Sequence, residues 1–95
     1  MAEVTIKLFG VFRTDTHLAK ETVKADTIDD IFPVLNELSL RIWDEKKKTA
    51  PDTKKPDPVR FKDAVVYVNG ERKSKKSYKL NNGDEIWIMS PASGG

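Results

Sequence analysis

The chain has 95 residues, of which 38% are hydrophobic and 34% charged, and its formal net charge is +2. This length allows one domain with one modest core, and it is too short to combine a nucleotide-binding domain with a substrate domain. The near-balance of charge gives no reason to expect a dedicated nucleic-acid-binding protein. Because the chain contains no cysteine, it can form no disulfide, no cysteine-ligated metal site and no persulfide relay of its own.

The chain also lacks the patterns of membrane and secreted proteins. No apolar run approaches the length of a membrane span, and residues 1–3 lack the basic and apolar regions of a signal peptide. We therefore expect a cytoplasmic protein with no membrane partner.

The first expected element is a strand over residues 4–9, where apolar and polar side chains alternate. Its core-facing side chains would be Val4, Ile6 and Leu8. Gly10 indicates a bend, past which residues 11–13 can extend the strand. The polar residues 14–17 indicate a turn, and a second strand over residues 21–25 is expected to pair with the first as a hairpin.

A helix is expected to begin near Asp26 and Thr27, with Asp29 and Asp30 in its first turn, where the helix dipole favours negative charge. Its apolar stripe has helical spacing and consists of Ile28, Ile31, Phe32, Leu35, Leu38 and Ile42. With Thr27 as the cap, Pro33 falls in the second turn and should disturb the helix. With Asp30 as the cap, Pro33 falls in the tolerated first turn, so both alternatives stay open.

The second half of the chain is expected to consist of a loop and further strands. Residues 44–62 are highly charged and contain three prolines, which predicts a long mobile loop. Residues 64–68 read as a strand, Asn69–Gly70 as a tight turn, and residues 77–80 as a further short strand.

A turn over residues 81–84 and a final strand over residues 85–89 complete the expected domain, with Ile86 and Ile88 facing the core. A hairpin, a crossover helix and further strands predict an α+β roll, in which a mixed sheet of four to five strands packs on one main helix. The sequence thus predicts one domain over residues 1–89 and a flexible tail over residues 90–95.

The basic residues gather at Lys46–Lys48, Lys54–Lys55 and Arg72–Lys76. Two interpretations stay open. These lysines and arginines either belong to solvated loops and a protected edge strand, or they meet an acidic surface of a partner.

No set of catalytic side chains is recognisable in the sequence. The single histidine, His17, lies in a polar stretch and is expected to be a surface residue, and no glycine-rich phosphate loop is present. Asp29 and Asp30 fit a helix start better than an acid–base pair. We therefore expect the chain to take part in a reaction as a carrier or co-substrate of an enzyme, with no metal site of its own.

The tail is the most informative segment of the sequence. Pro91 ends the last strand, and the residues after it, all small, are Ala92, Ser93, Gly94 and Gly95. Such a tail can thread into a narrow channel of another protein. Its terminal carboxyl, with a pKa of about 3.5, is ionised at neutral pH and needs activation, typically as an acyl-adenylate, before a nucleophile can attack it. A terminal glycine leaves that acyl carbon unshielded.

Four segments together resemble the ubiquitin-like sulfur carriers: the small subunit of molybdopterin synthase, the thiamine-pathway sulfur carrier and the ubiquitin-related modifier of tRNA thiolation. These segments are Val4–Arg13, the helix from Thr27, Val65–Gly70 and Leu80–Gly95. The last combines a Gly-Asp-Glu turn, a strand, a proline and a terminal Gly-Gly. The resemblance implies the β-grasp (ubiquitin-like) fold, which agrees with the order of elements above.

The resemblance also implies a reaction cycle. A ubiquitin-activating-type adenylyltransferase would use ATP to adenylate Gly95, and sulfur from a persulfide donor would then leave a thiocarboxylate on it. ATP and zinc would belong to that enzyme, so no cofactor is expected to bind this chain stably. The opening strand and the length resemble the molybdopterin synthase small subunit most, which implies the large synthase subunit as a partner in molybdenum cofactor biosynthesis. The charged loop over residues 44–62 departs from that pattern.

Other roles remain open beside this one. The sulfur could serve thiamine synthesis or tRNA thiolation, or Gly95 could be joined to lysines of target proteins, as in a ubiquitin-like modifier. A third hypothesis is a non-covalent ubiquitin-like interaction domain that does not use Gly95.

A candidate partner surface follows from the alternation of side chains along the strands. If Val4, Ile6 and Leu8 face the core, Phe9 faces outward, and Trp87 and Met89 do the same on the last strand. An outward apolar group beside the tail is a candidate docking site.

Overall fold

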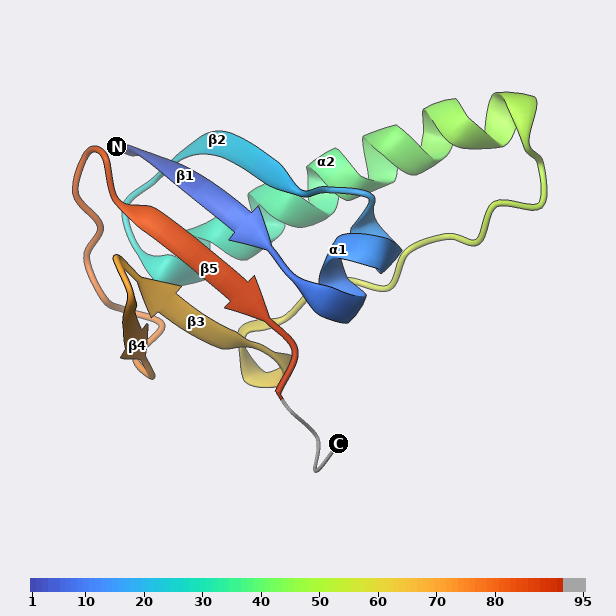
Figure 1. Ribbon diagram of the computed structural model, residues 1–95. Coiled ribbons are helices and arrows are strands. Elements are labelled where there is room, and N and C mark those ends of the chain that lie inside the picture. The colour runs from blue at the N-terminus through green and yellow to red at the C-terminus, as the bar shows by residue number, and fades with distance from the viewer. Residues whose placement is uncertain (92–95) are drawn as a thin grey trace.

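A computed structural model describes residues 1–91 as a five-stranded sheet with a long helix across one face (Figure 1). The strands are β1 (Ala2–Leu8), β2 (Lys20–Ala25), β3 (Val65–Val68), β4 (Glu71–Lys73) and β5 (Glu85–Met89). The helical elements are α1 (Gly10–Thr16), α2 (Ile28–Thr49) and the 3-10 turn η1 (Phe61–Asp63).

The first and last strands of the domain lie side by side at the centre of the sheet. Its strand order is β2-β1-β5-β3-β4, with β1 and β5 parallel and the other neighbouring pairs antiparallel. A hairpin, a crossover helix and a last strand inserted beside the first define the β-grasp fold. The expected mixed sheet on one main helix is confirmed, with five strands.

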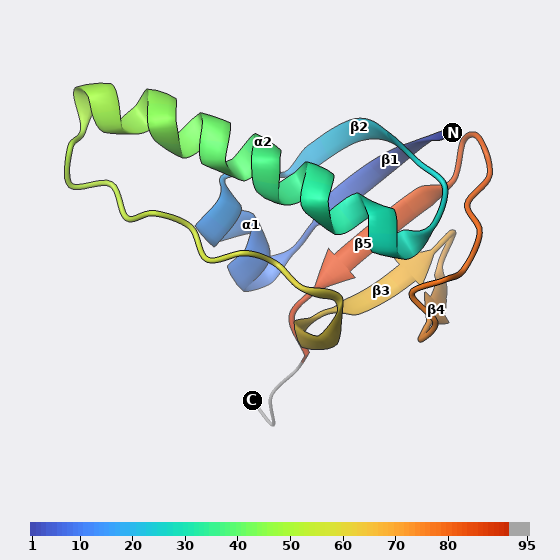
Figure 2. The same ribbon diagram turned by 180° about the vertical axis from the view of Figure 1, so that it is seen from behind.

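The core lies between α2 and the inner face of the sheet, and Figure 2 shows α2 crossing that face. The alternation expected for β1 and β5 is confirmed, because Val4, Ile6, Leu8, Ile86 and Ile88 are all buried. The helix stripe is buried at Ile28, Ile31, Phe32 and Leu35 and partly buried at Leu38 and Ile42. Within residues 1–91, no helix is both long and apolar enough to cross a membrane.

The start of α2 decides between the two alternatives for its cap. Thr27 has an extended backbone conformation, and its amide donates to the Asp30 carboxylate at 3.1 Å. The cap is therefore Thr27, and Pro33 lies inside the helix. Pro33 and Asp29 are both exposed, so water can satisfy the Asp29 carbonyl that loses its helical donor at Pro33.

The segment after β1 is a helix, so the expected strand extension over residues 11–13 and turn over 14–17 are wrong. In α1, the hydroxyl of Thr16 donates to the Phe12 carbonyl at 2.6 Å, and Phe12 packs against the core. Thr16 is buried, and its carbonyl lies 3.4 Å from the Ser39 hydroxyl of α2. Contact with α2 thus stabilises this helix. The sequence did not predict it, because its residues have only modest helix propensity.

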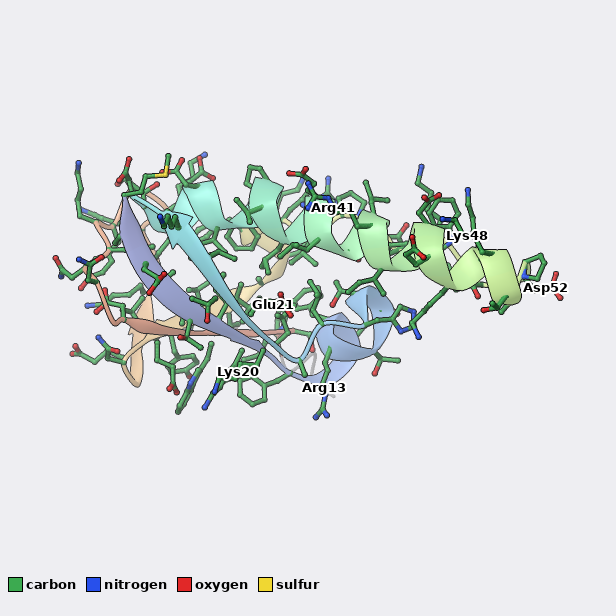
Figure 3. The ribbon with its side chains drawn as sticks, turned by 90° about the horizontal axis from the view of Figure 1, so that it is seen from above. Arg13, Lys20, Glu21, Arg41, Lys48 and Asp52 are labelled. Atoms are coloured by element: carbon green, nitrogen blue, oxygen red, sulfur yellow. The ribbon has the colours of Figure 1, made fainter. Side chains whose placement is uncertain are left out.

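The expected loop over residues 44–62 is wrong at both ends, because α2 continues to Thr49 and η1 begins at Phe61. Asp44 and Lys47 form an ion pair at 3.3 Å, and the ammonium of Lys47 lies 4.3 Å from the centre of the Trp43 ring. Three lysines in the last turn also complement the helix dipole. Figure 3 shows this end of α2 projecting past the sheet, with Lys48 near the helix end and Asp52 in the following turn.

The short strand expected over residues 77–80 is also wrong. Asn69 and Gly70 have positive φ angles of 51° and 87°, and this tight turn returns the chain at once along β3 as β4. The later segment bonds to the start of α2: the Tyr78 carbonyl accepts from the Ile28 amide at 3.2 Å. One isolated bridge, Thr27 with Lys79, is its only strand-like pairing among residues 1–91.

Asn36 fixes the returning loop to α2. Its amide group donates to the Val59 carbonyl at 3.0 Å and accepts from the Val59 amide at 2.8 Å. Val59 is 3% exposed and belongs to the core, so an Asn36→Ala variant would leave two backbone groups unpaired at a buried position. We expect the free energy of unfolding to fall by about 1–3 kcal/mol, measured by chemical denaturation.

The matched control is Glu37→Ala, which removes only an exposed ion pair with Arg41 on the same helix. It should cost no more than about 0.5 kcal/mol. Equal losses from the two variants would contradict the role given to Asn36.

Candidate functional site

The central strand β5 carries the chain from the core to the tail. Ile86 and Ile88 are fully buried, β5 ends at Met89, and Ser90 and the exposed Pro91 follow outside the strand. The predicted threading residues Ala92, Ser93 and Gly94, and the predicted reactive residue Gly95, lie outside the described residues. Figures 1 and 2 both place the end of β5 beside η1 and the start of β3.

The three residues predicted to bind a partner lie near one another on the sheet face opposite α2. Phe9 directly follows β1, is 39% exposed, and its amide donates to the Ile88 carbonyl at 3.0 Å. The Phe9 and Trp87 rings meet edge to face with centroids 6.0 Å apart. Trp87 and Met89 are half-buried on β5. The predicted outward orientation is therefore confirmed, and their binding role stays a prediction.

Tyr67 is a member of this surface that the sequence argument missed. It pairs with Trp87 across β3 and β5, and the two ring centroids are 6.2 Å apart. The alternation in β3, where Val66 and Val68 are buried, could have placed Tyr67 on the outer face. Its contact with Trp87 depends on the pairing of β3 with β5. We call Phe9, Tyr67, Trp87 and Met89 the aromatic patch.

Positive charges lie on both sides of the aromatic patch. The strand registers place one residue of each strand in a row across the outer face: Lys20, Lys7, Trp87, Tyr67 and Arg72. Figure 3 shows Lys20 and Arg13 pointing away from α2, on the same side as this row. The patch thus presents an apolar centre between cationic margins.

Glu85 orients the central tryptophan. The indole N–H of Trp87 donates to a Glu85 carboxylate oxygen at 2.6 Å, and the Lys7 ammonium lies 3.4 Å from the same oxygen. The hydrogen bond from Trp87, aided by the charge of Lys7, holds the pKa of Glu85 below its usual value. The ionised carboxylate in turn fixes the indole plane.

The structure places the titratable residues considered in the sequence, His17, Asp29 and Asp30, at helix ends. His17 is exposed and ends α1 with a positive φ of 62°. Asp29 and Asp30 lie in the first turn of α2, as expected. Across residues 1–91, no group of three or more histidine, aspartate or glutamate side chains is arranged to hold a metal ion.

Replacing Trp87 tests the link to Glu85. A Trp87→Phe variant keeps a ring in the patch but loses the indole donor, so the pKa of Glu85 should rise toward its ordinary value, measured by NMR of its side-chain carboxyl. A carboxyl whose pKa is depressed by folding stabilises the fold at pH values above its unfolded-state pKa, and this stabilisation is lost as pH falls through its folded-state pKa. The stabilisation from Glu85 should therefore be smaller in the variant. Tyr67→Phe should leave the pKa unchanged; a shift there of the same size would count against the assignment.

No family model matches the chain, and no curated protein sequence matches it. Solved structures do match it over nearly its whole length. One is small archaeal modifier protein 1 from Methanosarcina acetivorans, with 24% identity, 100% of this chain and 98% of that chain covered, and a TM-score of 0.69. Another is a putative molybdopterin converting factor, subunit 1, from Pyrococcus furiosus, with 19% identity, 97% and 100% covered, and a TM-score of 0.66.

A third match is a chain in the protein–protein complex of subunits 1 and 2 of molybdopterin-converting factor from Helicobacter pylori. It has 18% identity, a TM-score of 0.59, and coverage of 98% of this chain and 99% of that chain. Likeness at these identities establishes the fold. The expected β-grasp fold is therefore confirmed: the chain shares its fold with these converting-factor subunits and this modifier protein.

Proposed function

We propose that this chain is a sulfur carrier whose Gly95 carboxylate is converted to a thiocarboxylate, for use in molybdopterin synthesis. One observation carries the proposal: the central strand β5 passes through the aromatic patch, and after it only Ser90 and Pro91 precede the small residues 92–95. A docked partner would therefore lie beside the start of the tail. The similarity in fold to subunit 1 of a molybdopterin converting factor supports this choice.

The chemistry requires two steps at Gly95. A carboxylate oxygen attacks the α-phosphorus of ATP, which forms an acyl-adenylate and releases pyrophosphate. The terminal sulfur of a persulfide donor then attacks the acyl carbon and AMP leaves with its electron pair. A thiol of the donor cleaves the resulting sulfur–sulfur bond, which frees the thiocarboxylate and leaves a disulfide on the donor. Gly95 has no side chain to obstruct either attack.

The partners must supply every catalytic group, because neither cysteine nor a catalytic set is available in this chain. We assign ATP binding, and any zinc, to a ubiquitin-activating-type adenylyltransferase. The requirement for ATP is the reason for proposing a cytoplasmic location. The thiocarboxylate would pass to a large-subunit type partner, a role supported by the two-subunit complex of the Helicobacter pylori converting factor.

The second candidate function is conjugation of Gly95 to lysines of target proteins. It is favoured by the similarity to a protein named as a small archaeal modifier, and it needs the same acyl-adenylate. Amide-linked adducts on lysines would identify it. Sulfur carriage for thiamine or tRNA thiolation would differ only in the acceptor, and a non-covalent interaction domain would keep its function after removal of Gly95.

Intact-mass analysis tests the carrier function. Incubation with ATP, a sulfide donor and the cognate activating enzyme should add about 16 daltons, the difference between sulfur and oxygen. The control chain without Gly95 should gain nothing, because it ends one residue short of the activating site. No gain on the full chain, with an enzyme proven to form its acyl-adenylate, would overturn the proposal.

Truncating the aromatic patch should weaken docking and spare the fold. We expect Phe9→Ala to raise the dissociation constant for the activating enzyme by about fivefold or more, since an aromatic anchor in an interface typically contributes over about 1 kcal/mol. The control is Leu40→Ala, which removes a side chain of similar exposure, 41% against 39%, from α2. Calorimetric titrations in which both variants bind like the native chain would refute the docking role.

A further inference from the structure

A small groove lies between η1 and the end of β4. It has a volume of about 160 Å³ and is lined by residues of η1, β3 and β4 together with Ser74. Three of its lining residues are cationic, namely Lys62, Arg72 and Lys73, and Ser74 is a further polar member of the lining. The ring of Phe61, half-buried against the core, forms part of its wall.

The charge of this groove sets it apart from others on the described part of the chain. No aspartate or glutamate lines it, whereas each of four other grooves has at least one carboxylate in its lining. The nearest acidic residue along η1, Asp63, pairs with the guanidinium of Arg60 at 2.9 Å. Glu71 is exposed and lies 3.9 Å from the Lys73 ammonium, outside the lining.

Lys73 is held in place by two neighbours. Its ammonium lies 4.6 Å from the centre of the Tyr78 ring and 3.9 Å from Glu71, and its side chain is only 25% exposed. Lys62 and Arg72 form no ion pair with any other residue among 1–91. Because successive side chains of a strand point to opposite faces, Lys73, which pairs with the buried Val66, lies on the inner face of β4, and Arg72, which pairs with Tyr67, lies on the outer face. The groove thus has two cations that form no ion pair among residues 1–91, Lys62 and Arg72, and Lys73 adds positive charge from the opposite face of β4.

We propose that this groove binds the phosphoryl group of a small phosphorylated molecule. A phosphoryl group carries up to about two negative charges and several acceptor oxygens. It therefore suits a groove with two unpaired cations, a third positive charge nearby and no carboxylate in its lining. The planar guanidinium of Arg72 can donate two parallel hydrogen bonds, and the ammonium of Lys62 supplies a point charge. The volume admits one or two phosphoryl groups and excludes a folded segment of another protein.

The groove lies close to the end of β5, from which the tail continues. Val65 lines the groove and pairs with Met89, the last residue of β5. A bound phosphoryl group would therefore lie one strand away from the point where the chain leaves the sheet. The site nevertheless does not depend on chemistry at Gly95, so it can be tested without any activating enzyme.

The test is titration of the full chain with inorganic phosphate, pyrophosphate and ATP at low, constant ionic strength, followed by amide NMR and calorimetry. We expect saturable binding of pyrophosphate, with shifts confined to residues 61–66 and 72–74. The double variant Lys62→Gln/Arg72→Gln should bind at least about tenfold more weakly. Equal affinities for pyrophosphate and ATP would assign recognition to phosphoryl groups alone, and tighter binding of ATP would indicate a nucleotide.

The control is Lys46→Gln/Lys48→Gln, which makes the same change in net charge at the far end of α2, where Figure 3 shows Lys48. It should bind pyrophosphate like the native chain. The absence of saturable shifts at about 10 mM pyrophosphate, or equal weakening by both double variants, would overturn the proposal. Unchanged amide shifts elsewhere in each variant establish that the fold is retained.

Discussion

The parallel pairing of β1 with β5 is the interaction on which the rest of the structure depends. It joins the first and last strands of the domain at the centre of the sheet, where Ile6 and Ile86 pair and are both fully buried. Parallel neighbours require a long crossover, which here contains β2, α2 and the β3–β4 hairpin. Because of this pairing, Phe9 lies beside Trp87, and the aromatic patch forms from residues far apart in the sequence.

A buried carboxylate fixes where β5 begins. Asp84 is 7% exposed and accepts hydrogen bonds from the Asn69 side-chain amide at 2.9 Å and from the Asn81 amide at 2.8 Å. Asn69 in turn accepts from the Glu85 amide at 2.9 Å. These bonds tie the β3–β4 turn to the start of β5, and a buried acceptor without them would be costly. The register that brings Tyr67 opposite Trp87 follows from this connection.

The two faces of the sheet differ in burial because the single long helix α2 covers only one of them. The inner face holds the core under α2, and the outer face keeps a half-buried aromatic patch with cations at its margins. The extension of α2 and the returning loop lie beyond the sheet edge, and Trp43 joins them through a hydrogen bond to the Thr53 carbonyl at 2.9 Å. The basic residues of that extension are thereby separated from those around β4, so the clusters seen in the sequence belong to distinct surfaces.

The sequence by itself determined the strands β1, β2, β3 and β5, the helix α2, and the buried faces of β1, β5 and α2, because alternation and helical spacing are local properties. It also identified Phe9, Trp87 and Met89 as outward residues. Tertiary contacts decided the rest. The helix α1 exists because Phe12 and Thr16 pack inward, the last turns of α2 are stabilised by Trp43, and β4 follows a turn that leaves β3 at once. Strand pairing alone brought Tyr67 to Trp87, since residues far apart in the chain meet only once the sheet has formed.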